Sequence, residues 1–121
     1  MIKDRIQRLI EAYTDDREIL DLICSAVKAC HKYIAAVVDS ELVIMTAKHT
    51  LDPDDYRTAV SVADKKRTLV HNNLISEVGI LNRLCVKAGV PVVFEGNIGN
   101  RVEVGELAKV LTYQLYDARR M

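Results

Sequence analysis

The side chains best suited to chemistry lie together in one segment, residues 67–73. Arg67 and His71 are one helical turn apart, and Asn72 and Asn73 follow directly. A histidine can act as a base or a nucleophile near neutral pH, and an arginine binds anions through a rigid fork of donors. Asparagine is a poor residue inside a helix, so two in succession indicate a further constraint. His71 is therefore the candidate catalytic residue, with Arg67 and Asn73 as candidate ligand-binding residues beside it.

Three more polar residues are candidates for ligand binding. Asn82 and Arg83 lie about three helical turns after the first segment and partly on the same side of the expected helix. His31 belongs to the preceding helix and is expected to face Asn73. Each of these residues also has a structural interpretation, in which its side chain forms a hydrogen bond across the helix pair or is solvated.

The sequence lacks the spacings that hold metals or nucleotides. It contains no Cys-x-x-Cys, His-Glu-x-x-His or Glu-x-x-His pattern and no glycine-rich phosphate loop. The formal net charge is zero, which removes the basic balance typical of nucleic-acid binding. The short basic run Lys65-Lys66-Arg67 is interpreted as a solvated face. We therefore expect no metal, no cofactor and no nucleic-acid partner.

The composition predicts one helical domain that spans residues 1–121. Half of the residues are apolar and 28% are charged, with two prolines, five glycines and no tryptophan. Such a balance is typical of a small globular protein rich in helix formers. The three cysteines have no paired spacing, and neither a signal peptide nor a membrane-spanning stretch is visible. These features favour a cytoplasmic location without membrane association.

The expected framework is a hairpin of two long antiparallel helices, at about residues 16–50 and 53–88. Their apolar residues recur at intervals of three and four, the pattern of packed helices. Asp52 is a good N-cap for the second helix, Pro53 suits its first turn, and Gly89 is the expected residue after its end. The turn between the two helices is so short that they must run side by side.

Shorter helices are expected on either side of the hairpin, at about residues 2–13 and 100–119. Asn100 is expected to cap the last helix. Asp15 is expected to cap the first long helix, which is taken as continuous, although Asp39 marks a position where it could instead kink. The result is an all-α helical bundle with the long hairpin at its centre.

The geometry of the hairpin pairs particular residues across it. His71 is expected to lie opposite Tyr33, and Arg67 near Glu41. The structural interpretation of the second pair is a partly buried ion pair that fixes the register of the two helices. The functional interpretation is an anion-binding arginine in a cleft.

The turn end of the hairpin carries four consecutive apolar residues, Leu42, Val43, Ile44 and Met45. On a helix such a run faces every direction, which is typical of a buried helix or an interface. The flanking helices are too short to cover this end. The sequence therefore predicts a homodimer through the hairpin tips, the alternative being a kinked helix that folds the tip back onto its own core.

Short segments spread over the second long helix and the residues after it carry a resemblance to a known family. They are Asp55-Tyr56-Arg57, Ala63-Asp64-Lys65-Lys66-Arg67, His71-Asn72-Asn73-Leu74-Ile75, Ile80-Leu81-Asn82-Arg83-Leu84, Gly89-Val90-Pro91 and Phe94-Glu95-Gly96. These segments resemble a small bacterial family classed as domain of unknown function 3232, over about two thirds of the chain. The resemblance implies an all-helical fold and no established activity.

Two other helical families are more distant comparisons on the side of catalysis. Helical ribonucleases of the HEPN type are similar in size and dimeric, and carry an Arg and a His separated by four to six residues. Here three residues separate Arg67 from His71, and Lys66 has the spacing without the guanidinium. The phosphotransfer domains of histidine kinases place a His on a long helical hairpin, as His71 is placed, but the proline of their motif is missing after Asn72.

Two hypotheses about function follow. The first is a non-enzymatic module for self-association or for binding another protein through the apolar surfaces of the hairpin. The alternative is a catalytic or phosphotransfer bundle, HEPN-like or histidine-phosphotransfer-like, that uses His71. The question of enzyme activity stays open, and the sequence favours the first hypothesis.

Overall fold

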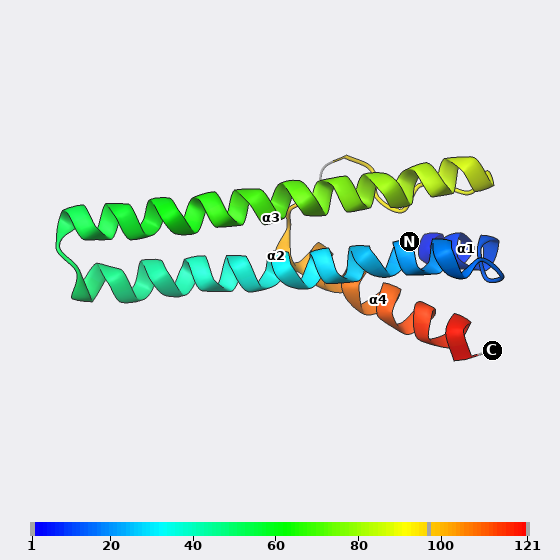
Figure 1. Cartoon of the computed structure of the whole chain (residues 1–121), viewed down its shortest axis with the longest axis horizontal. Helices are drawn as coiled ribbons and strands as arrows, with labels where there is room; N and C mark the ends of the chain where they lie inside the picture. Colours follow the sequence, from blue (N-terminus) through cyan, green and yellow to red (C-terminus); the bar gives the residue numbers. More distant parts are fainter. Residues whose placement is uncertain (1, 97, 121) are drawn as a thin grey trace.

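Two long helices dominate the computed structural model, which describes residues 2–96 and 98–120. The helices are α1 (Ile2–Ala12), α2 (Arg17–Thr50), α3 (Pro53–Ala88) and α4 (Arg101–Arg120). Helices α2 and α3 run side by side in opposite directions, and α1 and α4 lie at the end away from their turn (Figure 1). The all-α fold and the central antiparallel hairpin are thus confirmed. None of the described helices has an apolar stretch long enough to cross a membrane.

The caps explain where the hairpin helices begin and end. The Asp52 side chain accepts a hydrogen bond from the Asp55 N–H at 2.9 Å, and Pro53 occupies the first turn of α3. Gly89 ends α3 with a φ of 73°, a left-handed conformation that glycine adopts without steric cost. Helix α2 is continuous over 34 residues, so it is not interrupted at Asp39 as the alternative required.

The expected cap of α2 was wrong by one residue. The N-cap is Asp16, whose Oδ1 accepts from the Ile19 N–H at 3.1 Å, and not Asp15. The Asp16 N–H bonds to the Tyr13 carbonyl at 3.0 Å, so the turn after α1 extends one residue further before helical geometry resumes. Two adjacent aspartates satisfy the same sequence pattern, and the length of the turn selects between them.

The large buried side chains lie in only half of the molecule, where α1 and α4 meet the first half of α2 and the second half of α3. The fully buried ones include Ile6, Leu9, Ile23, Leu74, Leu81, Leu107 and Leu111. Along α3 no residue before Leu74 is buried. We call residues 36–69, beyond this core, the projecting half of the hairpin. Its buried residues are all small, namely Ala36, Ser40 and Ala47.

Candidate functional site

His71 packs against Tyr33 of the facing helix, as the hairpin geometry predicted. The two ring centroids are 5.2 Å apart and the ring planes are tilted by 37°. His71 Nε2 lies 2.8 Å from the carbonyl oxygen of Ile98. Because a carbonyl oxygen can only accept, Nε2 must carry the hydrogen, and Nδ1 is the only ring nitrogen left to act as a base. The Tyr33 hydroxyl donates to the Gly99 carbonyl at 2.7 Å, so both rings hold the residues that precede α4.

Asn82 uses both ends of its amide group on the segment that follows α3. Its Nδ2 donates to the Phe94 carbonyl at 2.8 Å, and its Oδ1 accepts from the N–H groups of Val93 and Phe94 at 3.0 and 3.3 Å. Val93 is 1% exposed, so its backbone N–H has little access to water and needs this partner. Asn82 therefore supplies hydrogen bonds that the non-helical backbone of this segment lacks.

Two further contacts join α1 and the turn that follows it to this region, and sequence reasoning missed both. The Tyr13 hydroxyl donates to the Leu84 carbonyl at 2.9 Å, and Arg5 Nη1 donates to the Val92 carbonyl at 3.4 Å. The partners lie 71 and 87 positions apart in sequence, and no local pattern connects positions so far apart.

The expected ion pair between Arg67 and Glu41 was wrong. Arg67 Nη2 instead lies 3.7 Å from Asp64 Oδ1 on its own helix. Glu41 Oε2 lies 3.2 Å from Arg101 Nη1 at the start of α4. The Arg67 side chain is 47% exposed, because no third helix covers this part of α3. Glu41 meets α4 because the chain returns to the middle of the hairpin before α4 begins (Figure 1).

The remaining candidate residues do not gather around His71. Asn73, Arg83 and His31 are all exposed. Of the six candidates, His71 and Asn82 thus contact the connection between α3 and α4, while Arg67, Asn73, Arg83 and His31 lie on the surface. Asn72, the neighbour of His71, is exposed as well.

The cysteines offer little nucleophilic chemistry near this site. Burial raises the pKa of the Cys30 thiol from 9.0 to about 11. Burial also raises the pKa of Cys85, partly offset by a hydrogen bond with the Val93 backbone. Both thiols therefore stay protonated at neutral pH, and it is the thiolate that reacts. Among the described residues, no three His, Cys, Asp or Glu side chains come together as they would around a metal ion.

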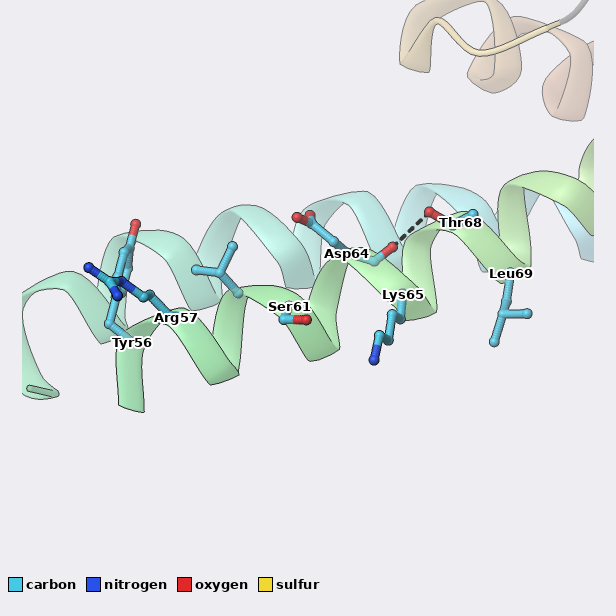
Figure 2. A pocket seen from close by; sticks show the side chains of 8 residues that line it. Tyr56, Arg57, Ser61, Asp64, Lys65, Thr68 and Leu69 are labelled. Carbon is cyan, nitrogen blue, oxygen red and sulfur yellow. Dashed lines mark hydrogen bonds between the residues drawn. The ribbon is translucent and has the colours of Figure 1, made fainter. Parts of the chain in front are cut away.

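A shallow groove lies on the projecting half, away from His71. Its lining side chains all come from α3, between Tyr56 and Leu69 (Figure 2). They include Arg57 and Lys65 at the surface, and the Thr68 hydroxyl within the groove donates to the Asp64 carbonyl at 2.9 Å. A groove formed by one helix face has no opposing wall to enclose a small ligand. It is better suited to contact with another helix than to catalysis.

The chain belongs to the family described as protein of unknown function DUF3232, whose family model matches residues 1–121. The resemblance seen over part of the sequence thus extends over the whole chain. A comparison with curated proteins gave no match. The family assignment brings no activity with it, so the function must be argued from the contacts described above.

Gly99 provides a sensitive test of the packing around His71. A methyl group on Gly99 would lie 3.3 Å from His71 Nε2, whereas at Gly105 it would meet nothing within 4 Å. We expect Gly99→Ala to lower the free energy of unfolding by about 1–3 kcal/mol, because the ring must move off the Ile98 carbonyl. Gly105→Ala, inside α4, should raise it by up to about 1 kcal/mol. Urea denaturation followed by circular dichroism measures both, and equal effects would show that His71 is free to move.

Proposed function

We propose that this protein is a non-enzymatic self-association module and that the projecting half of the hairpin binds a second copy of the chain. The supporting observation is the amount of apolar side chain left in contact with water there. Leu42 is 54% exposed, Met45 66%, Val62 63% and Leu69 71%. Ile44 is exposed too, and Val43 is half-buried. Isolated apolar residues are ordinary on a protein surface, but several exposed apolar side chains gathered in one region are typical of an interface.

The energetics of the hairpin point in the same direction. The projecting half buries no large apolar side chain fully, and burial of apolar surface is the main force that keeps helices packed. The projecting half of α2 and α3 has no third helix along most of its length (Figure 1). A second hairpin would supply the missing layer and produce a four-helix arrangement with an apolar interior.

For His71 we propose a structural role in place of the catalytic alternative. Its Nε2 is engaged by the Ile98 carbonyl and its ring packs on Tyr33. The candidate anion-binding residue Arg67 belongs to another part of the surface and pairs with Asp64. On this proposal His71, Tyr33 and Asn82 position the connection between α3 and α4. His71→Ala should then lower stability and leave self-association intact.

The mass of the full chain in solution tests the proposed function. The chain has a mass of 13.6 kDa. Sedimentation equilibrium over a concentration series from about one to one hundred micromolar should give twice that mass and should show dissociation on dilution. A mass of a single chain at every concentration would rule the proposal out.

A further inference from the structure

A second groove runs between the two arms of the projecting half. Its floor is made of small side chains, Ala36 and Ser40 from α2 and Ala59 and Ala63 from α3, and Val43 and Val62 add apolar walls. No side chain from α1 or α4 lines it. Small residues at such positions let another helix approach closely, but they do not by themselves identify what approaches.

Ser40 gives an independent sign that this groove is incomplete. The residue is 2% exposed, and its hydroxyl has no hydrogen-bond partner among the described residues. A buried polar group without a partner costs about 1–3 kcal/mol, so native structures rarely keep one without reason. Because Ser40 lines the groove, a group that enters the groove can reach it.

The groove also carries one charge of each sign on its two sides. Asp39 lies on the α2 side and Lys66 on the α3 side, and both are exposed. Neither makes an ion pair with another of the described residues. Residues 39 and 41 point to nearly opposite sides of a helix, and Glu41 contacts the start of α4. Asp39 and the groove therefore face away from α4, where a partner has free access.

We infer that a second copy docks on this open face with its α2 against α3, so that Asp39 of each copy meets Lys66 of the other. This inference rests on the proposed self-association and specifies its geometry. A two-fold axis parallel to the hairpin brings unlike charges together twice and makes all neighbouring helices antiparallel. A two-fold axis perpendicular to the helices would instead pack α2 of one copy on α2 of the other and place Asp39 of one copy near Asp39 of the other. The charges thus favour the first arrangement.

Charge reversal with mixing tests this geometry. Asp39→Lys alone and Lys66→Asp alone should each weaken self-association about tenfold or more, because each replaces two attractive contacts by two like-charge contacts. Mixing the two variants should restore association. In the mixed dimer the introduced lysine of one variant meets the introduced aspartate of the other, and the second contact keeps the native pair. Sedimentation equilibrium of each variant and of the equimolar mixture measures this, and circular dichroism verifies that these surface variants remain folded.

The outcomes separate the inference from the function on which it rests. A monomeric wild-type chain would overturn both. A dimeric wild type whose two single variants also dimerise with unchanged affinity would overturn only the docking geometry. The same holds if the variants are weakened but their mixture is not restored. Weakened self-association of each single variant, together with restored association of the mixture, would support α2 of one copy against α3 of the other. If Asp39 paired with Lys66 of its own chain, mixing the two variants would not restore association.

Discussion

Replacing Asn82 by alanine is expected to lower the free energy of unfolding by about 3 kcal/mol. The substitution removes all three hydrogen bonds to Val93 and Phe94. It takes these partners away from the backbone of a segment that is buried at Val93, and each buried backbone group that loses its last partner costs about 1–3 kcal/mol. Chemical denaturation monitored by circular dichroism gives the change directly.

The matched control is Asn73→Ala on the same helix. Asn73 is exposed and carries the same side chain, so its replacement should change the stability by no more than about 0.5 kcal/mol. Because the two substitutions have the same effect on helix propensity, the difference between them isolates the hydrogen bonds of Asn82. Similar values for the two variants would mean that Asn82 does not hold the connection between α3 and α4.

The second large effect, on self-association, is expected when negative charges are introduced into the projecting half. The triple variant Leu42→Glu, Met45→Glu and Val62→Glu should weaken self-association at least about 100-fold. Burial of one such apolar side chain contributes about 1.5–3 kcal/mol, and about 2.8 kcal/mol corresponds to a factor of about 100 in affinity. The three residues are 54%, 66% and 63% exposed, so the fold of the single chain should persist. They lie on both arms of the hairpin, two on α2 and one on α3, so the variant tests self-association without assuming the docking geometry inferred above.

The control for this triple variant uses exposed apolar residues outside the projecting half. Val86, Val102 and Tyr113 are 69%, 76% and 66% exposed. Their joint replacement by glutamate adds the same charge and removes a comparable amount of exposed apolar surface. This control should associate as the wild type does in sedimentation equilibrium. If both triple variants lose association alike, added charge is the cause and the projecting half has no special role.

Much of the fold was predictable because its signals are local. The Asp52 cap, the first-turn Pro53 and the left-handed Gly89 each act within one helical turn, and they fixed both ends of α3. Asn100 was predicted to cap α4 for the same reason, and its side chain accepts from the N–H groups of Val102 and Glu103. The pairing of His71 with Tyr33 followed from the hairpin turn alone, since an antiparallel pair has only one register once its turn is known.

The contacts of the candidate site depended on information that the helices do not contain. Asn82 was selected as an unusual helix residue, but its partners lie in an irregular segment whose path no periodicity describes. Glu41 was expected to pair with Arg67 because the hairpin geometry places the two residues near each other. Its partner is Arg101 because of where α4 begins relative to the hairpin. That position is set by tertiary packing in the core, and it cannot be predicted from sequence spacing.

The central claim is that the projecting half is buried against a second copy, and hydrogen exchange measured by mass spectrometry at two protein concentrations tests it most directly. Above the dissociation constant, backbone amides of residues 36–69 should exchange more slowly than they do after dilution to the monomer, because the interface stabilises these helices against local opening. Amides at the other end of the molecule, in α1 and the first half of α2, should exchange at the same rate at both concentrations. Exchange in residues 36–69 that is independent of concentration would contradict the account.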